Sequence, residues 1–193
     1  MKHPSNRELF EYWNQQRGGR RTPERGDLDP AAIRHLLADT FILACAPVTG
    51  YPFRVAGTRV CALFGRDLKG VAFLELWQTA SRDAIRELVT ISSCEAIGWV
   101  ASVSAATRIG AGHDLEMLML PLGTAGRAVR LLGALSLGGG PRGREANVLD
   151  ALTLGTLRYV DAETPSLLAQ RATDDVPRGY IRHGLVVYEG GLR

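Results

Sequence analysis

The sequence predicts an α+β domain with one antiparallel sheet that helices partly cover. Short helical patterns and one longer one fill the first half of the chain, and extended runs separated by glycine-containing turns follow. The 193 residues fit one domain with an extension at each end, and 46% hydrophobic and 22% charged residues are typical of a folded globular chain. We expect an N-terminal helix and arginine-rich link over residues 1–28, the domain over 29–140, and a C-terminal extension over 141–193 that is possibly partly docked on the sheet.

The first element is an amphipathic helix. Ser5 and Glu8 have the spacing of a capping box, and Gly18 and Gly19 end the helical pattern. The helix carries more apolar surface than an isolated helix can expose, which predicts burial against a second subunit of a homodimer. The alternative is that the helix folds back onto its own sheet. The candidate interface residues are Leu9, Phe10, Tyr12 and Trp13.

A second helix is predicted to start at Asp29 and Pro30, with Ile33, Leu36 and Leu37 on its apolar face. The run TFILACAP then changes to strand-like, a Gly-Tyr-Pro turn follows at residues 50–52, and PFRVAG continues as a second strand. These two runs predict a hairpin.

A short helix over RVCALF is predicted next. Thr58 can cap its start, Gly65 can end it, and Gly70 permits a further turn, because glycine tolerates the left-handed backbone. A longer helix starts at Ser81, with Ile85 on its inner face, and ends near Gly98.

The remaining sequence changes to extended runs. GWVASVSAATR, HDLEMLMLPLG and VRLLGALSLGG predict three antiparallel strands joined as a meander. NVLDALTLGTLRYV fits a helix or a strand, with the strand slightly favoured. Most of the tail is expected to be irregular, although LVVY at 185–188 could dock on a sheet edge.

Composition and spacing argue against several classes of function. The net charge is only +3, and four arginines between Arg17 and Arg25 form a local patch rather than a nucleic-acid surface. That patch could instead meet an anionic partner.

No apolar run suits a transmembrane segment or a signal peptide, so we expect a cytoplasmic protein. The three cysteines and four histidines lack metal-site spacing, and neither Ser102 nor Ser104 lies in a nucleophile motif, so we expect neither a metal nor an enzyme.

Four segments of the chain carry a resemblance to a known family. LFEYW, RRTPERGDLDP, FRVAGTRVCALFGRDLKG and LPLG resemble the single-domain PAS proteins of bacteria, known mainly from alphaproteobacteria and once catalogued as a domain of unknown function. The resemblance covers roughly residues 7–138. It implies a PAS-like five-stranded antiparallel sheet with helices on one face, a possible small-molecule cavity between them, and a role in signalling or protein localisation.

The best-known cofactors of PAS proteins are not expected here. A flavin photosensor of this fold needs an Asn-Cys-Arg-Phe segment where this chain has GRDLKGVAF, and residues 81–97 hold no histidine as an axial haem ligand. Haem ligation by His113 or His35 stays open as an alternative. An unidentified small organic ligand stays open.

Strand alternation suggests which side chains line a pocket. It places Trp99, Ala101 and Val103 on one sheet face and Glu116 on the other, which we expect to lie nearer solvent. Arginines at the mouth could hold a carboxylate or phosphate, or could simply pair with Asp67 or Glu75. The apolar residues could equally be ordinary core. The candidate ligand-binding residues are Arg54, Thr58, Arg66, Phe73, Trp77, Trp99, Met117 and Met119.

The sequence therefore predicts a stand-alone PAS sensory protein. It would bind a small molecule and pass the signal to an unknown protein partner, because no output module is recognisable in the sequence. The alternative is a ligand-free PAS interaction or adaptor module, because a filled cavity and a packed core use the same residues.

Overall fold

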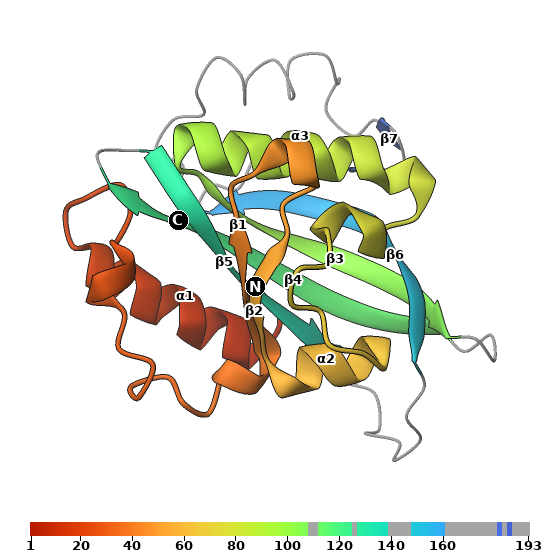
Figure 1. Cartoon of the computed structure of the whole chain (residues 1–193), viewed down its shortest axis with the longest axis horizontal. Helices are drawn as coiled ribbons and strands as arrows, with labels where there is room; N and C mark the ends of the chain where they lie inside the picture. Colours follow the sequence, from red (N-terminus) through yellow and green to blue (C-terminus); the bar gives the residue numbers. More distant parts are fainter. Residues whose placement is uncertain (108–111, 125–126, 139–147, 161–180, 183–184, 187–193) are drawn as a thin grey trace.

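The fold is built on a six-stranded antiparallel sheet (Figure 1). The computed structural model describes residues 1–107, 112–124, 127–138, 148–160, 181–182 and 185–186. The strand order in the sheet is β2-β1-β5-β4-β3-β6. The strands are β1 (Thr40–Ala44), β2 (Phe53–Ala56), β3 (Gly98–Thr107), β4 (Gly112–Thr124), β5 (Arg127–Leu137) and β6 (Leu149–Val160).

Helices cover both faces of this sheet. The inner face packs against α2 (Thr58–Phe64), the 3-10 turn η4 (Phe73–Leu76) and α3 (Thr79–Glu95), whereas α1 (Pro4–Arg17) lies across the outer face (Figure 1). Short 3-10 turns are η1 (Arg25–Asp27), η2 (Leu37–Asp39) and η3 (Pro47–Thr49). None of the helices within the described residues is long and apolar enough to span a membrane.

The predicted α+β class is confirmed, with two corrections of detail. The sheet has six strands rather than five, because the run that fitted either period forms β6 and pairs with β3. Helices also lie on both faces rather than one. Part of LVVY lies against the sheet edge as expected, because β8 (Leu185–Val186) contacts β6, although it pairs with β7 (Ile181–Arg182) in a separate two-stranded ladder. Residues 187–188 lie outside the described residues.

Two hydrophobic cores lie on opposite sides of the sheet. The predicted alternation is confirmed, because Trp99, Ala101 and Met117 belong to the inner core and Leu118 and Leu120 to the outer one. The expectation that the Glu116 side lies nearer solvent is wrong for this part of β4. Leu118 and Leu120 are completely buried, because α1 covers them.

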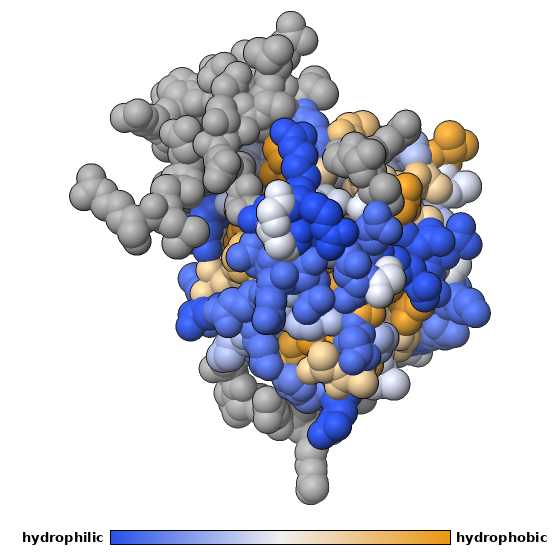
Figure 2. All heavy atoms as spheres, turned by 90° about the vertical axis from the view of Figure 1, so that its left-hand side faces the viewer, coloured by the Kyte–Doolittle hydropathy of each residue, from blue (hydrophilic) through white to orange (hydrophobic). Residues whose placement is uncertain are grey.

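Helix α1 folds back onto its own sheet. Leu9 and Trp13, two of the four candidate dimer residues, are 0% and 1% exposed in the outer core, and Phe10 and Tyr12 pack half-buried beside them. This corrects the premise of the dimer hypothesis, since the two most apolar anchors are already covered within one chain. Hydrophilic side chains dominate the side of the molecule shown in Figure 2, with only small apolar patches.

The start of α1 also differs from the prediction. Its N-cap is His3, and no side chain of the cap residue bonds the first turn, so the Ser5–Glu8 capping box does not form. The carboxylate of Glu116 on β4 accepts the N–H groups of Lys2 and His3, which immediately precede the helix. A tertiary contact, rather than a capping box, therefore positions the start of α1.

The predicted helix after Asp29 is a series of tight turns. The Asp29 carboxylate accepts the Ala31 N–H at 2.9 Å, and the backbone bonds run over three residues, as from Leu36 N–H to Ile33 C=O at 2.8 Å. Ile33 and Leu36 are buried in the outer core as expected, whereas Leu37 is 37% exposed. Short-range bonding to Asp29 favours turns over an α-helix here.

The glycine turns of the middle segment are confirmed. Gly65 ends α2 with φ +63°, and Gly70 has φ +83°, both in the left-handed region. Thr58 is the first helical residue rather than the cap, and Gly57 takes the cap position. Helix α3 ends in the same way, at Ala96 with φ +58°, before the chain reverses into β3.

Candidate functional site

An aromatic cluster fills the inner layer below β1 and β2. The ring centroids of Phe41 and Phe53 lie 5.3 Å apart, those of Phe53 and Phe73 5.9 Å apart, and those of Phe73 and Trp77 5.7 Å apart. Gly133 makes room for this cluster, because a Cβ there would lie 2.1 Å from the Cζ of Phe41. These rings stack edge to face as in a well-packed core.

Five of the eight predicted pocket residues are brought together in this layer. None of the five is more than 1% exposed. Trp99 lies between Met119 on β4 and Tyr159 on β6, which are its direct cross-strand neighbours. The five residues are Phe73, Trp77, Trp99, Met117 and Met119.

The three polar candidates lie elsewhere. Arg54, Thr58 and Arg66 are exposed and take no part in the inner core. Within the described residues, neither arginine forms an ion pair with Asp67 or Glu75. An arginine clamp at the mouth of an inner pocket is therefore not what the structure provides.

Three donors on completely buried residues of the described chain have no hydrogen-bond partner. They are Trp77 Nε1, Trp99 Nε1 and Ser92 Oγ, each on a residue that is 0% exposed. Leaving such a group unpaired costs about 1–3 kcal/mol, so native proteins usually satisfy it. The indoles were predicted as apolar lining. The helical period also places Ser92 on the inner face of α3, but Ser92 was not among the candidate ligand-binding residues.

Ser81, a buried serine on the same helix, does have a hydrogen-bond partner. Its Oγ accepts the Leu154 N–H at 3.1 Å, and the Gln78 N–H donates to the Leu152 carbonyl at 2.8 Å. These bonds tie the start of α3 to β6. Ser81 is therefore structural, whereas the buried Ser92 hydroxyl has no such use within the described residues.

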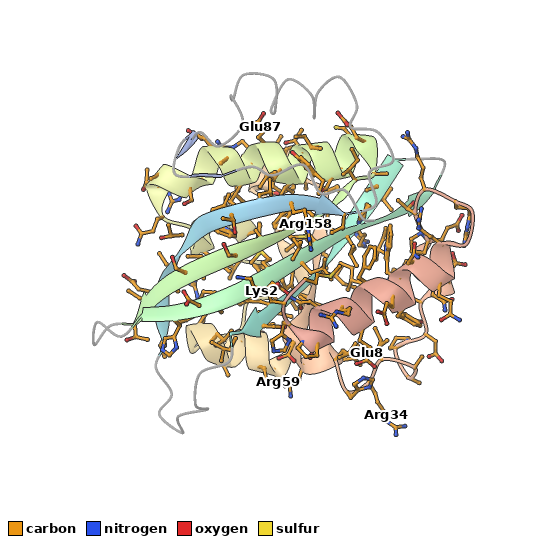
Figure 3. All side chains as sticks on the ribbon, turned by 180° about the vertical axis from the view of Figure 1, so that it is seen from behind. Lys2, Glu8, Arg34, Arg59, Glu87 and Arg158 are labelled. Carbon is orange, nitrogen blue, oxygen red and sulfur yellow. The ribbon has the colours of Figure 1, made fainter. Side chains whose placement is uncertain are left out.

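Tyr159 on β6 lies beside Trp99 in this part of the structure. Burial raises the pKa of the Tyr159 hydroxyl to about 12, and the carboxylates of Glu87 and Glu95 raise it further. Both glutamates project from α3 (Figure 3 labels Glu87). Ionisation of the Tyr159 hydroxyl is therefore disfavoured.

On the outer face, Glu116 holds the start of α1. Its two carboxylate oxygens accept the N–H of Lys2 at 2.6 Å and the N–H of His3 at 3.0 Å, and Asn6 Nδ2 donates to it at 3.0 Å. Asn6 is completely buried and accepts the Ser136 hydroxyl at 2.9 Å. Burial alone would raise the pKa of Glu116, but these hydrogen bonds outweigh it and hold the pKa below its ordinary value.

The lowered pKa makes a prediction about stability and pH. The ionised Glu116 stabilises the fold above its ordinary pKa of 4.5, and this contribution is lost as the pH falls through the lower folded value. We expect Glu116→Gln to be about 1–2 kcal/mol less stable at neutral pH, and the difference to shrink in acid. Urea unfolding at both pH values measures it. Asp114→Asn, at an exposed position on the same strand, is the matched control, and an undiminished difference in acid would contradict the assignment.

Two further contacts fasten the N-terminal segment along β4. Trp13 Nε1 donates to the Pro121 carbonyl at 2.9 Å, and Thr22 and Pro23 bond the backbone of Gly123 at 3.0 and 3.1 Å. Strand β3 pairs with β4 only as far as Met119, so this end of β4 lacks a β3 neighbour. The N-terminal segment takes that place beside the LPLG segment.

A groove of about 910 Å³ opens on the outer face, beside the contact of Glu116 with Lys2 and His3. Residues 1–4, 100–104, 114–116 and 155–158 line most of it, and Lys2 and Arg158 lie over the same region (Figure 3). Ser102 and Thr156 occupy its floor and bond each other at 2.8 Å. No cluster of three potential metal ligands occurs among the described residues.

The family follows from comparison with known proteins. A PAS-domain family profile matches residues 1–136, which is more than half of the chain. The chain belongs to the PAS-domain family. Its fold is thus that of a PAS domain, and β6 lies at the β3 edge of the sheet. No curated protein matches the sequence of this PAS protein.

Solved PAS and LOV structures are distant relatives in shape. The Aureochrome1 blue-light photoreceptor LOV domain is 16% identical, with a TM-score of 0.43 over 56% of this chain and 87% of that one. A PAS domain of an HTR-like protein from Haloarcula marismortui is also 16% identical, with a TM-score of 0.41 over 56% and 90%. A LOV protein from Rhodobacter sphaeroides is 11% identical, with a TM-score of 0.44 over 60% and 71%.

Proposed function

We propose that this PAS protein is a sensor that binds a small organic molecule in its inner layer. The observation that carries the proposal is the set of unpartnered buried donors, Trp77 Nε1, Trp99 Nε1 and Ser92 Oγ. Unpaired buried donors are costly unless a bound molecule supplies acceptors. Two of the three, Trp99 Nε1 and Ser92 Oγ, lie at the same end of the inner layer, so one molecule can meet both.

Space for the ligand comes from side-chain rearrangement. Met117 and Met119 lie beside Trp99 in the inner core, and methionine adapts its shape at little cost. A ligand that displaces them would keep the layer filled. No flavin or haem is part of the proposal.

Strand β4 gives the signal a route to the surface. Met117 and Met119 face the inner layer, whereas Glu116, Leu118 and the Pro121 carbonyl hold α1 on the other face. Displacement of the methionines would shift the same strand that fastens α1. We propose that α1 then presents a changed surface to a protein partner, either a second copy or another signalling protein.

Native mass spectrometry tests ligand binding. Freshly purified protein should show a discrete extra mass that is absent from the denatured spectrum, and Trp99→Phe should lower the occupied fraction because it removes one donor. Trp13→Phe is the matched control, since its indole lies on the other face and already has a partner. Occupancy that Trp99→Phe and Ser92→Ala leave unchanged would place the ligand elsewhere.

A ligand-free interaction module is the second candidate. The close ring contacts of Phe41, Phe53, Phe73 and Trp77 favour it, because they are those of a closed core. A single unliganded mass, unchanged after incubation with cell extract, would support this function instead.

We also propose that the protein catalyses no reaction of its own. His113 and Asp114 are successive strand residues, so their side chains leave opposite faces of β4. The Ser102 hydroxyl is engaged with Thr156. Both observations argue against a nucleophile with an adjacent base at these residues.

A further inference from the structure

We propose that the ligand is a neutral, largely apolar carbonyl compound whose oxygen accepts hydrogen bonds from Trp99 Nε1 and Ser92 Oγ. This inference rests on the proposed function and names the chemical class of the ligand and its place in the layer. Both donors are completely buried and lack a partner within the described residues.

The two donors lie at the same end of the inner layer. Ser92 is 13 residues after the start of α3, which places it about 20 Å from that start. The chain then reverses at Ala96, and Trp99 follows as the second residue of β3. Both residues therefore lie close to the reversal, on the inner side of the sheet.

Trp77 lies at the opposite end of the inner layer. It forms a β-bridge with Leu152 on β6, and Leu152 pairs with Ala105 on β3. Ala105 is six residues after Trp99 on that strand. Six strand residues span about 20 Å, which exceeds the length of a small ligand. One small molecule thus meets Trp99 and Ser92 but not Trp77.

The donor chemistry restricts the ligand to acceptors. An indole N–H can only donate, and a serine hydroxyl can donate at the same time to the second lone pair of one oxygen. A ketone, ester or amide oxygen meets both groups, whereas an ammonium group meets only the serine oxygen and a hydrocarbon meets neither. The neighbouring Met119 and Tyr159 supply apolar and aromatic contact for the rest of the molecule.

The charges around the site favour a neutral oxygen over a carboxylate. The buried polar residues of the described chain are Asn, Ser and Thr, with no Lys, Arg or His among them. Burial, and then the carboxylates of Glu87 and Glu95, raise the pKa of Tyr159, the cross-strand neighbour of Trp99. A buried anion without a cation is strongly disfavoured.

Three small probes of similar shape test the inference on the full chain. Acetophenone carries a neutral carbonyl, ethylbenzene has no acceptor, and benzoate is an anion. Titrations are followed by the indole N–H resonances of Trp13, Trp77 and Trp99 in heteronuclear NMR. We expect acetophenone to shift the Trp99 resonance downfield and to bind at least threefold more tightly than the other two probes, with Trp13 unchanged. Ser92→Ala should weaken acetophenone about two- to tenfold, as the loss of one hydrogen bond predicts.

Other outcomes overturn the inference. Equal binding of ethylbenzene, tighter binding of benzoate, or no Trp99 shift with any probe would each contradict a neutral carbonyl at this position. A co-purified molecule identified by mass as an anion or a cation would contradict the ligand class while the proposed sensor function stands. If no molecule of any kind binds, the sensor function itself fails.

Discussion

Replacing Trp13 with alanine is expected to lower the free energy of unfolding by about 3–5 kcal/mol, the largest effect we predict for one residue. Trp13 is 1% exposed in the outer core and anchors α1 through its bond to the Pro121 carbonyl. The substitution removes the ring, leaves a cavity under α1 and leaves a carbonyl unpaired. Urea unfolding followed by circular dichroism measures the loss.

Two further variants test which contacts of Trp13 account for the loss of stability. Trp13→Phe keeps most of the apolar contact and loses only the hydrogen bond, so we expect about 1–3 kcal/mol. Glu11→Ala, at an exposed position on the same helix, should change stability by less than about 0.5 kcal/mol. If Trp13→Ala kept the full unfolding energy but abolished self-association, α1 would be a dimer interface and its intramolecular packing would be wrong.

Gly57→Ala is expected to produce the second largest loss, at or above the range of about 1–3 kcal/mol seen for overpacked sites. A Cβ at this position would lie 2.2 Å from the Leu37 carbonyl oxygen and 2.4 Å from that of Ala38. Both neighbours are backbone atoms, so η2 and the start of α2 would have to separate. The shift would also strain the bond from Gly57 N–H to the Thr40 carbonyl, at 2.8 Å.

Gly19→Ala is the matched control for this prediction. Nothing lies within 4 Å of a Cβ at Gly19, so the same substitution should be nearly neutral there. Thermal unfolding of the two variants checks the difference. Equal melting temperatures would mean that the close approach at Gly57 does not constrain the fold.

The local elements that the sequence predicts with success are those whose signal lies within a few residues. Gly65 and Gly70 do adopt left-handed backbone, and the strict alternation along β4 correctly separates Met117 from Leu118. The helix expected after Asp29 fails because the Asp29 carboxylate and the three-residue bonds favour turns. Local propensity was too weak there to decide between two compact backbones.

The candidate site also divides into residues that the sequence predicts and residues that only the structure identifies. Its apolar members Phe73, Trp77 and Met119 are predictable, because bulky residues at inward positions gather in one core. Arg54 and Arg66 lie outside this core, because the structure leaves both residues exposed at the surface. Ser92 could not be recognised as a candidate ligand-binding residue, since only the packed structure shows that its hydroxyl lacks a partner among the described residues.

By itself, the sequence determined the α+β class, the PAS resemblance and the inward set of side chains, because period, turn chemistry and composition are local properties of the chain. The tertiary structure alone decided where α1 lies and which buried donors stay unpaired. Helix α1 carries an apolar face that a second subunit or its own sheet could cover equally well. Glu116, Pro121 and Gly123 on β4 settle that choice through bonds to residues about 100 or more positions earlier, which no local pattern records.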